Sequence, residues 1–153
     1  MEKLDLSGRR VLVVGLGVSG RAAALFCADR GASVVAVDER AQDAIDGLGA
    51  LAARSADVEL RSGTRLPPPA TEAAGCDLVV PSPGVPRERY ANVAAPVWGD
   101  VELLYRALPR AVRIAAITGT NGKSTTTTLV EALVRAGGLR TSAAGNLGDP
   151  ALG

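Results

Sequence analysis

The stretch Arg10-Val-Leu-Val-Val-Gly-Leu-Gly-Val-Ser-Gly20 decides the fold of this chain. It begins with a short continuous apolar run, which is typical of a β-strand buried on both faces of a parallel sheet. The run ends in three glycines with the spacing Gly15-x-Gly17-x-x-Gly20. Apolar residues then recur at helical spacing as far as Gly31, a natural residue at which to end a helix. The stretch therefore predicts a strand, a glycine turn and a helix.

A second strand follows this helix and ends in an acidic residue. Ser33-Val-Val-Ala-Val leads to Asp38, eighteen residues beyond Gly20, and completes a βαβ unit close to the Rossmann fingerprint. In that fingerprint the helix N-terminus binds a pyrophosphate, and the acid accepts a hydrogen bond from the sugar or the base. Two alternatives stay open. The glycines could serve only the packing of helix on strand, and Asp38 could be a solvated acid that caps the next turn.

Further helices and strands are predicted on either side of a proline-rich connector, Leu66-Pro-Pro-Pro69. Gly47 and Gly49 weaken the first of these helices. The predicted elements are a helix over 41–54, strands over 58–61, 76–80 and 96–99, and a helix that begins at Asp100, carries the apolar residues Val101, Leu104, Tyr105 and Leu108, and ends before Pro109.

A proline-glycine loop, Pro81-Ser-Pro-Gly-Val-Pro86, stops the strand over 76–80. Ligands collect at the carboxyl ends of strands in a doubly wound sheet. Ser82 and the backbone at Gly84 could therefore donate to the ligand that the first glycine turn binds. A plain rigid turn is the alternative.

A second glycine turn lies in Ile114-Ala-Ala-Ile-Thr-Gly-Thr-Asn-Gly-Lys-Ser-Thr125. The pattern predicts a strand over 111–118 and a helix over 123–136, joined by a loop whose N–H groups can bind phosphate. Lys123 would reach the β- and γ-phosphates of ATP, and Ser124, or alternatively Thr125, would ligate Mg²⁺. The predicted ATP-binding residues are Gly119, Thr120, Asn121, Gly122, Lys123, Ser124 and Thr125.

The glycine spacing of this loop departs from the general phosphate-loop pattern GxxxxGK[ST]. Only Thr120 and Asn121 separate the glycines, and Ile117 stands where the first glycine is expected. An ordinary strand-to-helix turn with a solvated Lys123 is therefore the alternative. The apolar segment before the loop and the helical pattern after it favour a phosphate site.

The composition is ordinary for a soluble chain. The 153 residues carry a formal net charge of +1 and only 3% aromatic residues, which argues against nucleic-acid binding. No membrane span or signal peptide is predicted, so a cytoplasmic location is expected. The chain has no histidine and no C-x-x-C spacing, which excludes a zinc site and a Ser-His-Asp nucleophile. Cys27 and Cys76 are expected to be small buried apolar residues.

Pro109 marks the predicted domain boundary. Residues 1–108 are predicted to form an α/β domain, a Rossmann-like parallel sheet with helices on both faces. Residues 109–153 are predicted to begin a P-loop ATPase-type domain, with a further strand over 139–143. About two strands cannot cover both faces of such a sheet, so we expect a part of a longer enzyme or dependence on a partner.

Four features, in this order, resemble the Mur ligases, and in particular their D-glutamate-adding members. The shortened phosphate loop is the form that this family has. The features are Gly15-Leu-Gly-Val-Ser-Gly20, Ser82-Pro-Gly-Val85, Gly99-Asp-Val-Glu-Leu103, and Thr118-Gly-Thr-Asn-Gly-Lys-Ser-Thr125 followed by Gly145-Asn-Leu-Gly148.

The resemblance implies that the first domain binds the UDP of UDP-N-acetylmuramoyl-L-alanine rather than NAD. By this resemblance, the diphosphate would be bound by Gly17, Val18 and Ser19, and the uridine side by Asp38, Glu39 and Arg40. The neighbouring strand would contribute Ser82, Pro83 and Gly84. Asn146 would contact the muramoyl end. Glu39 stands where the family can have a small hydroxyl residue.

The resemblance also implies a reaction of peptidoglycan synthesis. ATP would phosphorylate the terminal carboxylate of the substrate, the amine of D-glutamate would attack the acyl phosphate, and inorganic phosphate would leave. Lys123, as the catalytic residue, and Mg²⁺ would neutralise charge on the transferred phosphoryl group. Further ligands of the family lie beyond this chain, so the isolated polypeptide is expected to show no ligase turnover.

Two other functions compete with the ligase. The fingerprint and Asp38 alone would suit an NAD-binding module, although such a module does not need Lys123. A non-catalytic protein that binds UDP-sugars is the third hypothesis.

Overall fold

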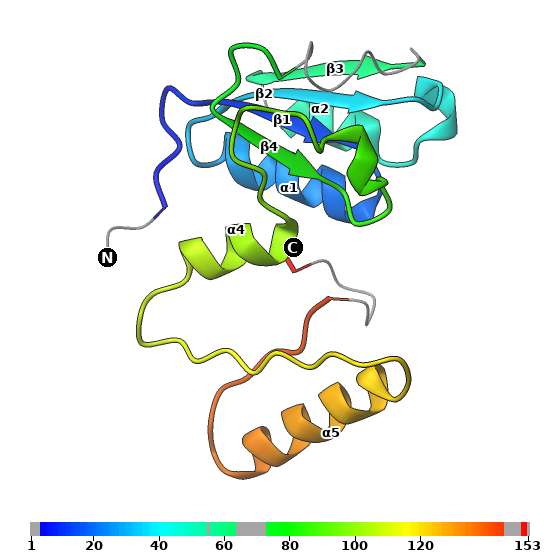
Figure 1. Ribbon diagram of the computed structural model, residues 1–153. Coiled ribbons are helices and arrows are strands. Elements are labelled where there is room, and N and C mark those ends of the chain that lie inside the picture. The colour runs from blue at the N-terminus through cyan, green and yellow to red at the C-terminus, as the bar shows by residue number, and fades with distance from the viewer. Residues whose placement is uncertain (1–3, 55, 64–72, 146–150, 153) are drawn as a thin grey trace.

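A parallel sheet forms the centre of the molecule. The computed structural model describes residues 4–54, 56–63, 73–145 and 151–152. The sheet has four strands in the order β3-β2-β1-β4 (Figure 1). They are β1 (Arg10–Val14), β2 (Ser33–Asp38), β3 (Val58–Ser62) and β4 (Leu78–Pro81). Because every pairing is parallel, the carboxyl ends of all four strands meet at one edge of the sheet.

The central strand β1 is buried on both faces. Val11 and Val13 belong to one apolar core, and Leu12 and Val14 belong to the core on the opposite face. All four side chains are at most 1% exposed. Successive side chains of a strand point to opposite faces, so a continuous apolar run fills both cores. The prediction from the opening stretch is confirmed.

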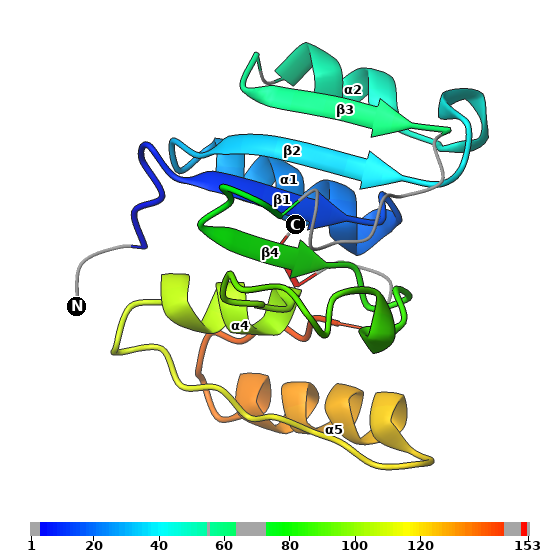
Figure 2. The ribbon, with the colours of Figure 1, turned by 45° about the horizontal axis from the view of Figure 1, so that its top comes forward.

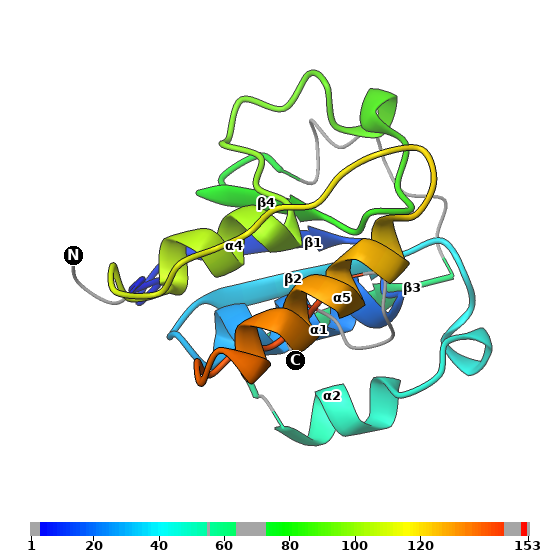
Figure 3. The same ribbon diagram turned by 90° about the horizontal axis from the view of Figure 1, so that it is seen from below.

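Three helices cover one face of the sheet, as Figures 1 and 3 show. They are α1 (Val18–Ala28), α2 (Leu48–Arg54) and α4 (Asp100–Ala107). Their buried residues, which include Ala24, Leu51 and Leu103, share the core of Val11 and Val13. In the described part of the chain the opposite face is packed by Ala73, Cys76, Val85, Val93 and Ala95. The expectation of helices on both faces is therefore confirmed for one face only.

Glycine conformation breaks one of the predicted helices. The segment 41–54 forms a short 3₁₀ turn, η1 (Gln42–Ala44), and then α2. Gly47 lies between them with φ +77°, a left-handed conformation that does not continue a right-handed helix. The single helix predicted over 41–54 is thus wrong.

The strand predicted next to β4, over 96–99, is not formed. Val97 makes a single parallel bridge with Val79, with no strand over 96–99. Within α4, Leu103 is fully buried, whereas Val101 and Tyr105 are each 62% exposed. Two of the four apolar residues from which the helix was predicted therefore face outward, and the other two, Leu104 and Leu108, are half-buried. Leu66–Pro69 falls outside the described residues.

The segment after Pro109 forms one helix and no described strand. α5 (Lys123–Ala136) has the predicted bounds and lies apart from the sheet in Figures 1 and 2. The strands predicted over 111–118 and 139–143 are not formed. An apolar segment becomes a strand only when a neighbour completes its hydrogen-bond ladder, and no described residue pairs with these segments. No residue from 109 to 145 is buried.

None of the described helices is both long enough and apolar enough to cross a lipid bilayer.

Candidate functional site

The turn between β1 and α1 depends on its glycines. Gly15 has φ +85°, and a Cβ there would lie 2.8 Å from Cγ2 of Val85. A Cβ on Gly20 would lie 1.8 Å from the carbonyl oxygen of Gly15. The first turn of α1 can therefore pack directly against the end of β1 only with glycine at position 20. Gly20 thus has the packing role that the sequence left open as an alternative.

The N-terminus of α1 points its first amides toward the carboxyl edge of the sheet. Gly17 is the N-cap residue, and no side chain of the described residues caps this end. The first N–H groups of a helix lack intrahelical acceptors, and they carry part of the positive end of the helix dipole. An anion placed beside Gly17 would therefore meet both unpaired donors and a favourable field.

Asp38 lies at the end of β2 and is only 6% exposed. Its Oδ2 accepts hydrogen bonds from the amide of Leu16 at 2.6 Å and from Nη2 of Arg40 at 2.8 Å. Its Oδ1 accepts from the amide and from Nε of Arg40 at 2.9 and 3.0 Å. The side-chain hydrogen bonds of Arg40 are the main cause that lowers the pKa of Asp38 to about 2, against the effect of burial.

These contacts make Asp38 a link between two loops. A carboxylate has about four acceptor positions, and four donors occupy them here. The carboxylate fixes the Gly15–Gly17 turn through Leu16, and it orients the guanidinium of Arg40. It is not the solvated strand-end acid that the sequence left open as an alternative.

The loop after β4 closes the third side of the site. The amide of Ser82 donates to the carbonyl of Val14 at 2.8 Å, which holds the loop against the end of β1. The amide of Val85 then donates back to the carbonyl of Ser82 at 2.9 Å and closes a tight turn. The side chain of Ser82 consequently lies beside the first glycine turn.

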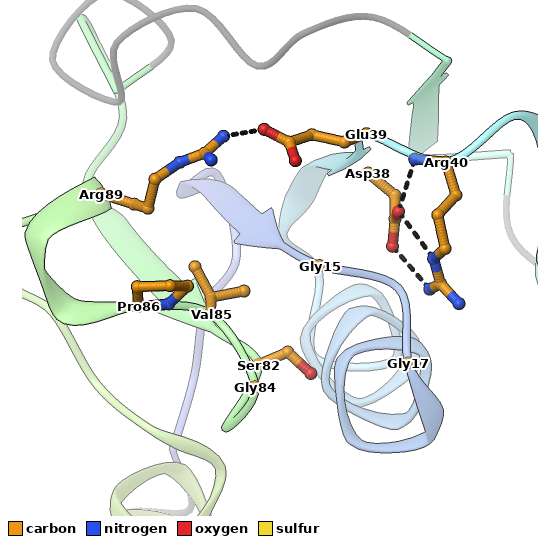
Figure 4. A pocket seen from close by; sticks show the side chains of 10 residues that line it. All are labelled: Gly15, Gly17, Asp38, Glu39, Arg40, Ser82, Gly84, Val85, Pro86 and Arg89. Carbon is orange, nitrogen blue, oxygen red and sulfur yellow. Dashed lines mark hydrogen bonds and ion pairs between the residues drawn. The ribbon is translucent and has the colours of Figure 1, made fainter.

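A pocket of about 400 Å³ lies where these three segments meet, as Figure 4 shows. It occupies the carboxyl edge of the sheet above β1, between the ends of β2 and β4. Parallel α/β sheets bind ligands at this edge. Its lining residues are Gly15, Gly17, Asp38, Glu39, Arg40, Ser82, Gly84, Val85, Pro86 and Arg89.

Most of the residues predicted for the uridine diphosphate line this pocket. Gly17, Asp38, Glu39, Arg40, Ser82 and Gly84 are in its wall. Val18, Ser19 and Pro83 neighbour wall residues in sequence without lining the pocket, and Asn146 lies outside the described residues.

Four wall residues were missed by the sequence prediction: Gly15, Val85, Pro86 and Arg89. The first three belong to motifs that were already quoted, so a prediction of whole motifs would have found them. Arg89 belongs to η2 (Arg87–Arg89), and no motif marked it. It forms an ion pair with Glu39 across the pocket.

The second glycine turn has the backbone that the sequence predicts. Gly119 has φ +150° and Gly122, the N-cap of α5, has φ +74°. Nζ of Lys123 contacts the carbonyl of Gly119 and lies 3.3 Å from that of Thr120, so the side chain folds back over the loop. The seven predicted phosphate-binding residues are all exposed.

The threonines of α5 are accommodated through their hydroxyls. Oγ1 of Thr127 donates to the carbonyl of Lys123 at 2.8 Å, and Oγ1 of Thr128 donates to that of Ser124 at 3.0 Å. Such bonds let threonine satisfy its hydroxyl within a helix. Ser124 and Thr125, the predicted magnesium ligands, lie in the first turn of α5. Among the described residues no group of three His, Cys, Asp or Glu side chains could hold a metal ion.

The strand order, the glycine turn and the pocket at the carboxyl edge place the chain in the class of Rossmann-like α/β proteins. A solved structure of SirC, a precorrin-2 dehydrogenase, is similar with a TM-score of 0.54 at 16% sequence identity, covering 89% of this chain and 70% of that one. At this identity the likeness shows the fold alone.

The sequence identifies the family. Residues 9–99 match the family model described as Mur ligase MurD-like, N-terminal domain, and the chain belongs to this family. It is 50% identical over 151 residues to the UDP-N-acetylmuramoylalanine--D-glutamate ligase of Anaeromyxobacter dehalogenans (strain 2CP-C), with 95% of this chain and 31% of the relative covered. The ligase of the same name from Myxococcus xanthus (strain DK1622) is 47% identical, with 96% and 32% covered.

The resemblance to the Mur ligases that the motifs indicated is thus confirmed. The chain spans about a third of the length of the curated relatives that it matches.

Proposed function

We propose that the chain is the N-terminal, nucleotide-binding part of an ATP-dependent ligase that adds D-glutamate to UDP-N-acetylmuramoyl-L-alanine in peptidoglycan synthesis. One observation carries this proposal. The uncapped N-terminus of α1, the Asp38–Arg40 pair and the Ser82 loop converge on one pocket at the carboxyl edge of the sheet. The names of the relatives supply the nucleotide that this pocket would take.

The pocket offers a separate place for each half of a nucleoside diphosphate. The diphosphate would lie at the N-terminus of α1, beside Gly17, Val18 and Ser19. The uridine would lie toward the end of β2, where Arg40 is held by Asp38. The loop Ser82–Gly84 would contact the nucleotide from the side of β4, and Asn146 would contact the muramoyl end.

The hydrogen bonds that the Asp38 carboxylate already makes favour UDP over NAD as the ligand. In the dinucleotide fingerprint the acid after the second strand accepts hydrogen bonds from ribose hydroxyls. Here the acceptor positions of Asp38 are filled by Leu16 and Arg40. An NAD ribose would have to displace Arg40, whereas a UDP ligand could use Arg40 as Asp38 now orients it.

For residues 109–153 we propose the start of an ATP-binding domain. The positive φ angles of Gly119 and Gly122 and the uncapped N-terminus of α5 suit a phosphate cradle. Lys123 would exchange the loop carbonyls for the β- and γ-phosphates of ATP. Mg²⁺, held by Ser124 or Thr125, would supply further positive charge there. Ligase turnover is proposed for the whole protein, through an acyl phosphate that the amine of D-glutamate attacks.

Calorimetry on the 153-residue chain with UDP, UDP-N-acetylmuramoyl-L-alanine and NAD⁺ tests the first half of the proposal. Both uridine ligands should bind, and NAD⁺ should not. Tight NAD⁺ binding without UDP binding would instead identify a nicotinamide module.

Titration with ATP and Mg²⁺ tests the second half and separates a ligase from a non-catalytic UDP-sugar-binding protein. We expect Lys123→Ala to weaken ATP binding about tenfold or more, because it removes a charged hydrogen-bond donor from the phosphates. Arg135→Ala, which removes a cation from the far end of α5, is the matched control and should leave ATP affinity unchanged. A whole protein that binds UDP and shows no measurable ATP affinity would support the non-catalytic alternative.

A further inference from the structure

An ion pair between Glu39 and Arg89 spans the pocket. Glu39 follows β2, and Arg89 lies fifty residues further on, in the loop after β4. Because β1 lies between β2 and β4, the pair crosses above the carboxyl end of β1. Figure 4 shows it on the side of the pocket opposite Gly17 and Ser82. Arg89 is 35% and Glu39 is 47% exposed, so both side chains remain open to a ligand.

The guanidinium of Arg89 has donors to spare. Among the described residues its side chain forms a hydrogen bond only with Glu39, through one of its terminal nitrogens. A guanidinium carries five N–H donors in a fixed plane, so most of them remain available. Arg40 differs, because it commits both Nε and Nη2 to Asp38. Arg89 is therefore the cation in the pocket wall with the greater capacity to bind a ligand.

The position and charge of the pair indicate which half of a nucleotide it would contact. The anion site at the N-terminus of α1 lies on the other side of the pocket, at Gly17. The carboxylate of Glu39 also neutralises Arg89, which weakens its attraction for phosphate and leaves its hydrogen-bonding groups in place. The carbonyl oxygens of a nucleobase are the matching acceptors.

We propose that Arg89 binds the base of the nucleotide and that Glu39 is a positioning residue that holds the guanidinium over the pocket. This inference rests on the proposed UDP-binding function. It gives Glu39 a part in the site that differs from the direct contact predicted from the sequence: the carboxylate acts through Arg89.

Binding of UDP, uridine and inorganic pyrophosphate to the 153-residue chain and its Arg89→Ala variant tests the assignment. UDP and uridine should each lose affinity by the same factor, about tenfold, because one charged donor to the base is removed. Pyrophosphate affinity should not change. Arg87→Ala, which removes an exposed guanidinium from the same turn η2, is the matched control and should leave all three affinities unchanged.

Three results of this experiment would overturn the inference. They are an unchanged UDP affinity in Arg89→Ala, a loss for UDP without a loss for uridine, and a loss for pyrophosphate. Failure of the unaltered chain to bind UDP would refute the proposed function itself, which is a distinguishable outcome. Thermal unfolding of each variant checks that it is folded. Should Arg89→Ala not fold, Arg89→Lys keeps the cation without the planar fork and should weaken UDP and uridine equally.

A double-mutant cycle tests the role of Glu39. Glu39→Ala should weaken UDP binding about threefold in the unaltered chain and have no effect in the Arg89→Ala background, since its action passes through Arg89. An equal loss in both backgrounds would show that Glu39 contacts the ligand directly and would refute its positioning role. Tighter UDP binding by Glu39→Ala would refute that role as well, because it would mean that the pair obstructs the pocket.

Discussion

At the scale of single residues, Asp38 ties the stability of the domain to pH. Its folded-state pKa of about 2 lies below the ordinary value of 3.8, chiefly through the hydrogen bonds from Arg40. A carboxyl whose pKa is lowered on folding stabilises the native state above its unfolded pKa, and this contribution is lost as pH falls toward the folded pKa. We therefore expect a contribution of at most about 2 kcal/mol at neutral pH that disappears between about pH 4 and pH 2.

Urea unfolding of the unaltered chain and of Asp38→Asn at pH 7, 4 and 2.5 measures this contribution. The difference in the free energy of unfolding between the two proteins should shrink as the pH falls. Asp29→Asn, which changes an exposed acid at the end of α1, should keep the pH dependence of the unaltered chain. A constant difference between the Asp38 variant and the unaltered chain would contradict the assignment.

A second prediction at the scale of single residues concerns Gly20. Gly20→Ala should lower the free energy of unfolding by about 2 kcal/mol or more, because the new methyl group would overlap the carbonyl of Gly15. Gly49 of α2 is the control, since it is also helical and a Cβ there meets no atom within 4 Å. Gly49→Ala should stabilise the chain by up to about 1 kcal/mol. Equal effects of the two substitutions in urea unfolding would refute this packing role.

At the scale of elements, α5 differs from the helices on the sheet. It has fourteen residues and none of them is buried, and Leu129 and Leu133 are 58% and 64% exposed. Isolated helices of this length are marginal in water, because most helix stability in proteins comes from packing of an apolar face. Its two threonine hydroxyl bonds and the Glu131–Arg135 ion pair are local and exposed, so they add little.

Hydrogen exchange followed by mass spectrometry tests this difference in the 153-residue chain. Amides of α5 should exchange far faster than those of β1 and β2, whose side chains fill both cores. α1 provides the comparison within the same molecule, because it is a helix with four buried residues and should be well protected. Equal protection of α1 and α5 would show that α5 has packing partners which the structure does not place there.

At the scale of the whole molecule, the pocket and its supports lie before Pro109. The lining residues run from Gly15 to Arg89, and the family match runs from residue 9 to residue 99. From 109 to 145 no residue is buried, although Leu152 packs against the first core. We therefore expect residues 1–108 to fold and bind UDP without the rest of the chain.

Comparison of a 1–108 fragment with the whole chain measures this independence. Its thermal midpoint should fall by less than about 5 °C, because Leu152 is the only described residue beyond 108 that packs against the core. Its affinity for UDP should match that of the whole chain. A fragment that is unfolded at room temperature would place the domain boundary elsewhere.

The sequence predicted correctly those elements that depend on residues close together in the chain, and it failed where contacts between distant residues decide the structure. β1, α1 and β2 were predicted because an unbroken apolar run, a glycine turn and a 3.6-residue period are local patterns. The strands predicted over 111–118 and 139–143 failed, because an apolar run does not specify the neighbour that its ladder needs. In α4 the pattern marked Val101 and Tyr105, but contact with the sheet decided that Leu103 is buried.

The sequence by itself determined the parallel βαβ core and two glycine turns, and through its motifs the Mur ligase family, since each is written in residues close together in the chain. Only the tertiary structure decided that Asp38 is already engaged by Leu16 and Arg40, and that Arg89 meets Glu39 across the pocket. The physical reason is that parallel strands bring their carboxyl ends to one edge of the sheet. Side chains fifty residues apart meet there, without any local pattern that announces the contact.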